Sequence, residues 1–525
     1  SFFNYKNGDG FRPNSKFESK NIYAHIGYQI KSDTKISGEI TYLNYLAQQA
    51  GGLTDQMFNS NPFQSNRARN WFQVDWLLYN LKFEHKFSEN TNFTFNAFGL
   101  NASRYSLGFR TNRVDQIDPL EERDLIKGDF NNFGFETRIL NKYKLFNKKA
   151  TILLGSKYYK ADNTGQQGPG SEGTDPNFDF QLEEYPNYGN QSNYTYPNVN
   201  IAVFGENILY LNDKLSITPG FRFEYIKTES KGFYKNINTD AAGNVILNET
   251  IDNSEVRKRS FALLGLGIGY KPVDALEIYG NISQNYRSVT FSDISIINPA
   301  FSISPSISDE KGFTTDLGLR GNYINIVSYD VGVFGLFYKN RIGFIQKAFP
   351  DGSVKTVRGN VGDAVMYGLE SLIDFNLNKL FIKDNDYSFN YFINTSIIDS
   401  KYTVSEENGV EGKKVEFVPN LNFKTGLKFG YKNFLSNFQY TYLSQQFTDA
   451  TNAVEGNLSG VIGEIPSYDV LDISFSYTYK KFKLEAGVNN VLDNYYFTRR
   501  ATGYPGPGII PSANRNFYMT LQIKL

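Results

Sequence analysis

The sequence contains no cysteine, so disulfide frameworks, thiol nucleophiles and thiolate metal sites are excluded. It contains two histidines, His25 and His85, and each lies in a segment with the pattern of a β-strand. A histidine metal site and a histidine-activated nucleophile therefore both lack the residues they need. We predict that the protein is not an enzyme and needs no cofactor.

Long apolar runs are also missing. The longest, such as FALLGLGIGY at 261–270, fall short of the roughly 20 residues that a membrane helix requires. Lysine plus arginine and aspartate plus glutamate each number 54, so there is no overall basic charge that would predict a nucleic-acid partner. If this chain crosses a membrane, it does so with strands.

The chain has no visible internal boundary. A length of 525 residues would fit several soluble domains, although barrels often exceed that norm. Aromatic residues, glycines and charges are spread evenly, and no Ser/Pro-rich linker or block of like charge divides them. We therefore predict one domain, a β-barrel over residues 1–525.

Aromatic residues are abundant, with 45 Phe and 37 Tyr. Both favour strands, and tyrosine suits a membrane interface because its ring is apolar while its hydroxyl stays in water. Apolar residues recur with a period of two, which predicts strands with one apolar and one polar face. The clearest apolar sets are Leu471, Ile473, Phe475, Tyr477 and Tyr479; Leu215, Ile217, Phe221, Phe223 and Tyr225; and Phe517, Met519, Leu521, Ile523 and Leu525.

Connections between the expected strands alternate in length. Residues 212–214 and 480–481 are very short links, whereas 162–198 form a long polar one that includes a glycine-rich surface loop at 165–180. Short turns on one side and long loops on the other distinguish a membrane barrel from a soluble sandwich. We predict an all-β, transmembrane antiparallel barrel of about 22 strands, with long extracellular loops and short periplasmic turns.

The C-terminal run 484–525, which contains Asn489, Asn490, Asp493 and Tyr496, resembles the closing strand pair of the TonB-dependent outer-membrane transporters. Further similar segments are 7–15, 51–72, 279–289 and 357–370, and they most resemble the ferric citrate and siderophore branch in Bacteroidetes-type bacteria. Within 484–525, residues 501–514 are expected to form the last external loop, in which prolines meet no strand ladder.

The resemblance implies import of a ferric chelate, such as ferric citrate or a siderophore, across a bacterial outer membrane. Its implied partners are that chelate, the TonB complex acting through a plug domain, outer-membrane lipid and lipopolysaccharide, and possible outer-membrane accessory proteins. The family begins with a TonB box and a plug, and nothing in this sequence resembles either. We therefore expect the sequence to start inside the barrel, without the box, the plug or the first strand or strands.

A chelated ferric ion already has its inner shell filled, so the protein need supply no metal ligand. What such a complex presents outward is negative charge, which arginine meets with a planar, two-pronged set of donors. Each arginine could instead pair with a lumen carboxylate or a lipopolysaccharide phosphate. The candidate ligand residues near strand ends are Gln48, Gln49, Arg104, Arg110, Arg113, Arg287, Arg358, Arg499 and Arg500.

Two other functions remain open from the sequence. The chain could be a passive diffusion channel without a plug, or a structural subunit of a larger outer-membrane complex. For the importer, we expect Arg287 and Arg500 to matter more to uptake than to folding, because loop and lumen positions should add little to the stability of the barrel.

Overall fold

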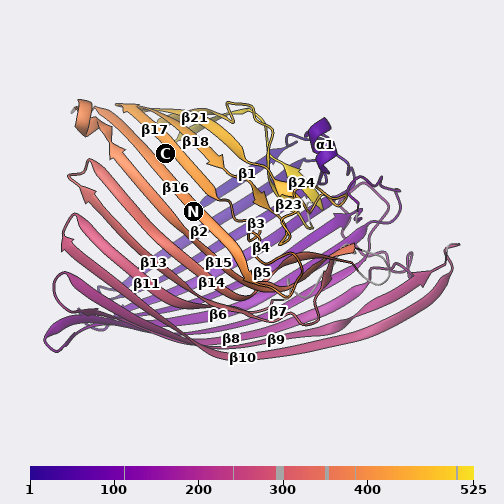
Figure 1. Ribbon diagram of the computed structural model, residues 1–525, viewed down its shortest axis with the longest axis horizontal. Coiled ribbons are helices and arrows are strands. Elements are labelled where there is room, and N and C mark those ends of the chain that lie inside the picture. Colours follow the sequence, from indigo (N-terminus) through magenta and orange to yellow (C-terminus); the bar gives the residue numbers. More distant parts are fainter. Residues whose placement is uncertain are drawn as a thin grey trace.

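The computed structural model describes residues 1–111, 113–240, 242–290, 301–348, 354–382, 384, 386–503 and 506–524. Within these residues, 21 strands form one large sheet that curls around a central space (Figure 1). Its first half comprises β1 (Phe2–Gly8), β2 (Phe17–Lys31), β3 (Thr34–Gln48), β4 (Trp71–Lys86), β5 (Thr91–Gly108), β6 (Asp124–Leu145), β7 (Lys148–Pro169), β8 (Ser192–Tyr210), β9 (Leu215–Thr239) and β10 (Val245–Val273).

The later strands of the chain continue the same sheet. It comprises β11 (Leu276–Arg287), β12 (Phe301–Ile303), β13 (Glu310–Tyr323), β14 (Val327–Ala348), β15 (Val354–Asn376), β16 (Tyr387–Val404), β17 (Leu421–Tyr431), β18 (Phe434–Leu443), β21 (Tyr468–Tyr479), β22 (Phe482–Asn489) and β25 (Asn516–Ile523). Neighbouring long strands pair antiparallel, while the short β12 runs parallel to β15. The predicted all-β antiparallel barrel is thus confirmed.

Tight turns join the strands at one end of the barrel. The β6–β7 turn is typical: Leu145 pairs with Lys148, and the two residues between them, Phe146 and Asn147, have φ of 50° and 61°. Positive φ at both positions marks the turn type whose twist matches that of paired strands. At the other end lie the long loops, the helix α1 (Asp55–Ser60) and the short strands β23 (Phe497–Ala501) and β24 (Gly508–Pro511), on the right of Figure 1.

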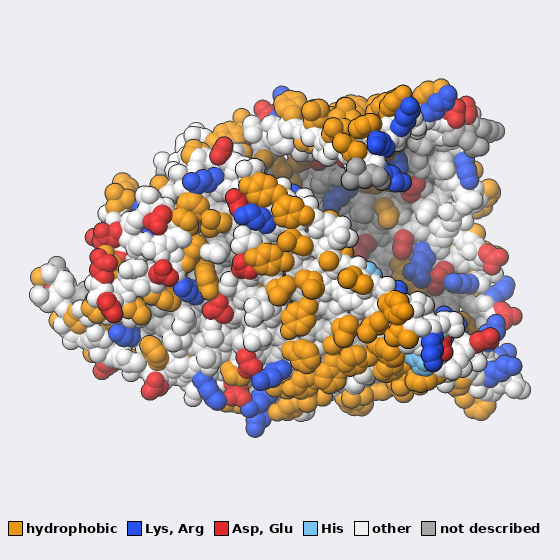
Figure 2. Space-filling view, turned by 180° about the vertical axis from the view of Figure 1, so that it is seen from behind, with side chains coloured by type: hydrophobic (Ala, Val, Ile, Leu, Met, Phe, Trp, Pro, Cys, Tyr) orange, Lys and Arg blue, Asp and Glu red, His pale blue; other side chains and the backbone are white. Residues whose placement is uncertain are grey.

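The outward face of the sheet is apolar. On β25, Phe517 and Met519 are each 75% exposed, whereas Tyr518 and Thr520 lie on the opposite face. The register carries this pattern sideways, since Met519 is opposite Ala486, which is opposite Phe475. Figure 2 shows hydrophobic side chains gathered over the half of the molecule away from the loops. Such a continuous exposed apolar surface requires lipid.

The inward face is polar and hydrogen-bonded. The Glu39 carboxylate accepts from the Tyr23 hydroxyl (3.2 Å) and the Asn80 amide (3.1 Å). Further along the sheet, Arg222 and Asn200 both donate to Glu224. Figure 2 shows a hollow that opens into the molecule. The barrel therefore encloses a wet lumen, as the alternation predicts.

Several strands run further than the alternation indicates. Strand β7 extends to Pro169 and β8 begins at Ser192, so the expected loop 165–180 begins as strand. The hairpin of β9 and β10, with 25 and 29 residues, projects beyond its neighbours (Figure 1). Above the membrane both faces meet water, so the apolar–polar contrast disappears although the backbone ladder continues.

The last external loop is also more ordered than expected. Strand β24 contains Pro511, which lies opposite Phe497 of β23, so a short ladder does form beside the prolines. Proline lacks only the N–H donor, and it is accepted at the end of a two-stranded ladder. The prediction for residues 501–514 was therefore wrong on this point. Pro505 and the outward placement of Leu525 lie outside the described residues.

Helical structure is confined to α1 and a five-residue π-helical turn, Asn378–Ile382, within the described ranges. Thr54 caps α1 by accepting a hydrogen bond from the Met57 N–H (3.2 Å). In the part of the chain that the structure describes, no helix is long and apolar enough to cross a membrane. A six-residue helix is too short to show a helical period, so α1 could not be predicted from the alternation of apolar residues.

The two faces of β25 provide a matched test. Met519→Arg should lower the free energy of unfolding in lipid vesicles by about 2–4 kcal/mol, because it places a cation in the hydrocarbon. Thr520→Arg, one residue away on the lumen face, should have a much smaller effect. Equal losses in denaturant titrations of the two variants would contradict this assignment of faces.

Candidate functional site at the loop end

Two loops, one from each end of the chain, are joined by backbone hydrogen bonds. The Leu53 N–H donates to the Ile509 carbonyl (2.9 Å), and the Ile509 N–H donates back to Leu53 (2.8 Å). Around this pair, Leu53, Ile465, Phe497 and Ile509 form a buried cluster against α1. We call loops 49–70, 444–467 and 490–515 together the loop cap. The loop cap forms one side of the mouth of the barrel at its loop end, and we call this mouth the vestibule.

Arg500 is the central cation of the loop cap. Its side chain is 1% exposed, and its guanidinium donates to both carboxylate oxygens of Asp55 (2.8 and 2.5 Å). It also donates to the carbonyls of Glu464 (2.8 and 3.1 Å) and Gly460 (3.3 Å). Arg500 therefore ties β23 to α1 and to loop 444–467, and it has little capacity left for a ligand.

Four further buried arginines hold neighbouring loops in the same way. Arg69 forms a two-pronged pair with Asp118 (2.5 and 3.0 Å), and the fully buried Arg123 donates to the carbonyls of Arg69, Ser171 and Asp175. The other two, Arg12 and Arg67, donate to loop carbonyls, and burial lowers the pKa of Arg12 to about 10. The sequence analysis did not single out these side chains, because only the fold shows which carbonyls they satisfy.

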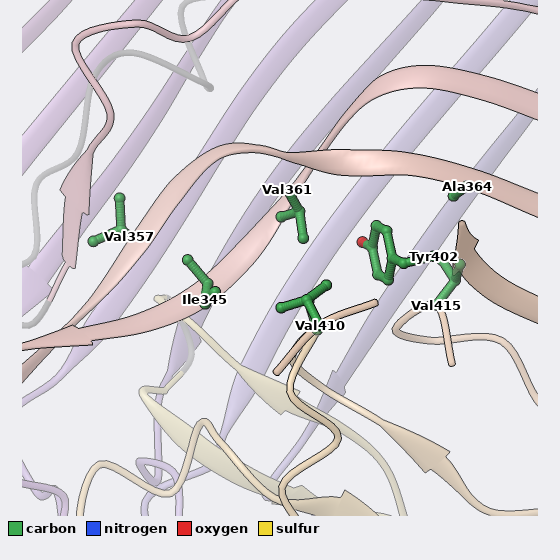
Figure 3. Packing of buried hydrophobic residues seen from close by; sticks show 8 residues of the cluster. Ile345, Val357, Val361, Ala364, Tyr402, Val410 and Val415 are labelled. Carbon is green, nitrogen blue, oxygen red and sulfur yellow. The ribbon is translucent and has the colours of Figure 1, made fainter. Parts of the chain in front are cut away.

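A second packed group lies across β14, β15 and β16. Figure 3 shows Val361, Tyr402 and Val410 pointing toward one another, with Ile345 and Val415 nearby. Beside them the Glu416 carboxylate accepts from Arg341 (2.8 Å) and from the Tyr402 hydroxyl (2.7 Å). This core fixes loop 405–420 on the strands below it, so this side of the vestibule is also built rigidly.

Three candidate arginines are engaged with protein groups. Arg287, at the end of β11, pairs with Glu310 (3.0 Å). Arg358 on β15 lies over the Phe344 ring (4.8 Å), and Arg110 pairs with Asp124 (3.4 Å). Arg287 and Arg358 have further contacts as well. The side chains of Arg110, Arg287 and Arg358 are therefore held in place by neighbouring protein groups.

The remaining candidates are more accessible. Arg104 projects from the lumen face of β5 over the Phe130 ring (5.7 Å). Arg499 is exposed and has no hydrogen bond or ion pair within the described ranges. Arg113 is also exposed, but it pairs with Asp115 (2.9 Å).

The two glutamines lie where β3 enters the loop cap. The Gln48 amide donates to the Ala68 carbonyl (2.6 Å). Gln49 is half-buried, and its backbone N–H donates to Asn70 (2.8 Å). Among the candidate arginines in the described residues, Arg104 and Arg499 are the ones whose side chains form no hydrogen bond or ion pair with the protein.

A cavity of about 910 Å³ opens on the lumen wall below loop 405–420. Its lining includes the carboxylates Asp316, Asp330 and Glu370. Acidic side chains disfavour an anion, so a negatively charged chelate would not settle in this cavity. In the described part of the chain, no group of three or more His, Asp or Glu residues could hold a metal ion.

Comparison with known proteins gives one family match. The model for the TonB dependent receptor-like β-barrel matches residues 23–491. Among solved structures, the ferric citrate transporter FecA in its unliganded form superposes with a TM-score of 0.79 at 17% identity, covering 99% of this chain and 72% of that one. The ferric yersiniabactin uptake receptor FyuA from Yersinia pestis gives 0.73 at 14%, covering 99% and 74%. The copper transporter OprC gives 0.74 at 15%, covering 99% and 75%.

The adjacent arginines of β23 should behave differently. Arg500→Ala should raise hydrogen-exchange rates of residues 53–60 and 497–501 by roughly 30-fold, because it removes charged hydrogen bonds and leaves Asp55 unpaired. Arg499→Ala should leave those rates unchanged. If Arg500→Ala exchanges like the unaltered protein, the loop cap does not depend on this contact.

Proposed function

The chain belongs to the family of TonB-dependent receptor-like β-barrels, and on that premise we propose that it imports a ferric chelate across a bacterial outer membrane. The cargo class is an anionic complex such as ferric citrate or a siderophore complex. The supporting observation is a wide polar lumen whose mouth is framed by tightly packed loops, with arginines that remain accessible. A rigid frame suits recognition because little ordering entropy is lost when the ligand binds.

In this proposal the arginines divide into two roles. Arg104 and Arg499 offer open guanidinium groups to the carboxylates or other oxygens of the chelate. Arg113 is exposed but paired with Asp115, so it meets the chelate only by leaving that carboxylate. The other candidates already have protein partners and shape the vestibule: Gln48, Gln49, Arg110, Arg287, Arg358 and Arg500. The chelate reaches these side chains only by displacing their present partners.

The energy for import comes, in this proposal, from the TonB complex acting on a plug within the lumen. The described strands form the wall of the path for import, and the loops between them form its mouth. The polar inner face lets a hydrated complex pass, and the apolar outer face keeps the barrel fixed in lipid. The iron enters as cargo inside its chelate, so the protein has no need of a metal ligand.

Binding of labelled ferric citrate to the purified protein tests the cargo and the two arginines together. Arg104→Ala and Arg499→Ala should each weaken binding by roughly tenfold or more, the scale of a hydrogen bond to a charged group. Arg320→Ala is a matched control, because that arginine lies near the turn end of β13 and pairs with Glu277. Unchanged affinity in both test variants would remove them from the site. If no ferric chelate binds, the iron assignment fails.

A passive channel would give a different result in a planar bilayer. A large, constant conductance without saturable uptake would contradict TonB-dependent import. A structural subunit would instead co-purify with partner proteins at fixed stoichiometry, and its deletion would leave growth on ferric citrate unchanged.

A further inference from the structure

The long hairpin of β9 and β10 leaves one side of β10 without a neighbouring strand. Strand β11 pairs with β10 only as far as Ser283, which lies opposite Gly265. Toward the loop end, β11 then pairs with β13 alone, whereas β10 continues along β9 to Val245. In the described part of the chain, residues 248–256 of β10 therefore pair on one side only. We call these residues the open edge.

A single side-chain hydrogen bond shows which backbone groups the open edge presents. The Leu264 N–H points toward β11, because it donates to the Gln284 side-chain oxygen there (3.0 Å). The register of β10 with β9 is unbroken from Leu264 to residue 248, and the backbone groups of successive residues in a strand point to alternate sides. Every second residue back from Leu264 therefore directs its N–H and C=O to the open side. In the open edge these residues are Asn248, Thr250, Asp252, Ser254 and Val256.

The open edge lies in water and lacks the usual protection of a strand edge. It lies beyond the lipid-facing part of β10, and all its residues are exposed except the half-buried Ile251 and Glu255. Natural sheets protect such edges with proline, lysine or a β-bulge. The open edge contains no proline or lysine, and the bulge of this hairpin lies beyond it, between Val245 and Leu247. Its row of backbone groups is therefore available to another strand.

The charge of the open edge is negative. The carboxylates of Glu249 and Asp252 are exposed and have no hydrogen bond or ion pair with the described residues, while Glu255 pairs with Arg257. Glu249 and Asp252 are three residues apart, so one lies on each face of the strand. A cation directly opposite a carboxylate on a neighbouring strand stabilises the pairing. A partner strand with two cations three residues apart therefore matches both carboxylates.

We propose that the open edge binds an extended basic peptide, which adds to β10 as an antiparallel strand. Backbone hydrogen bonds supply the affinity in this mode of recognition, and side chains opposite the edge select the sequence. The preferred peptide carries two lysines or arginines three positions apart, opposite Asp252 and Glu249, with β-branched residues between them. Peptide binding here is separate from the proposed import of a chelate, because no candidate chelate residue belongs to the open edge.

The test uses a fluorescein-labelled peptide, Thr-Val-Lys-Thr-Val-Lys-Thr-Val-Thr, and the purified protein in detergent, with binding followed by fluorescence anisotropy. In the antiparallel arrangement its lysines lie opposite Asp252 and Glu249, and its odd-numbered residues hydrogen-bond to β10. Methylating the backbone nitrogens of the fifth and seventh residues should therefore weaken binding by roughly tenfold or more, because two of these hydrogen bonds are lost. Methylating the fourth and eighth, whose N–H groups point away from β10, should leave binding unchanged.

Variants of β10 provide the matching test on the protein. Thr250→Pro removes one N–H from the open edge without removing a donor to β9, and it should weaken binding roughly tenfold. Thr250→Ala keeps that N–H and should bind like the unaltered protein. Glu249→Gln combined with Asp252→Asn should weaken binding about fivefold, and added salt should reduce this difference. Hydrogen exchange at Ile251 and Asn253, whose N–H groups point to β9, checks that the hairpin remains folded.

Three results would overturn the proposal. The first is a Kd weaker than about 1 mM for the unmethylated peptide. The second is equal binding by the two methylated peptides, or by Thr250→Pro and Thr250→Ala. The third is a dimer that light scattering detects without peptide and that Thr250→Pro abolishes, because the open edge would then belong to a contact between two copies of the protein.

Discussion

The structure depends on backbone hydrogen bonding in a solvent that offers none. Within hydrocarbon, an unpaired N–H or C=O cannot turn to water, so each strand must be paired along its length. The long antiparallel ladders meet this requirement, and β6 with β7 pairs continuously from Leu145–Lys148 to Asp124–Pro169. Once the backbone groups are paired in this way, successive side chains of a strand face lipid outside and water inside. Apolar residues therefore recur with a period of two along the sequence.

Above the membrane the same requirement is met by other means. The loops cannot all form ladders, and where they are buried their carbonyls need donors. Arginine, with five N–H groups in a planar fork, satisfies several carbonyls at once. Arg123 joins three loop segments, and Arg500 joins β23 to α1 and loop 444–467. The ordered mouth of the barrel thus depends on buried cations as much as on its small apolar clusters.

The sequence predicted the strands within the membrane better than the structure of the loop end. The outward faces of β9, β21 and β25 follow directly from alternation, because the contrast between lipid and water is strong there. The extensions of β7 to β10 were missed, because above the membrane that contrast is absent. For the site, composition and spacing placed arginines near strand ends but could not separate Arg499 from Arg500. Only the position of Asp55, 445 residues away along the chain, shows that Arg500 is engaged.

Separating engaged from open arginines changes how an anion would be recognised. A guanidinium paired with a carboxylate is nearly neutral at a distance, so Arg500 with Asp55 or Arg287 with Glu310 adds little long-range attraction. Arg104 and Arg499 have no carboxylate partner among the described residues, so their positive charge acts on the surrounding potential without a neighbouring anion to offset it. Specificity for a chelate then arises from the spacing of a few open cations within a frame held rigid by the closed ones. The same residue type therefore builds the frame and supplies the binding groups, and burial decides which role each arginine takes.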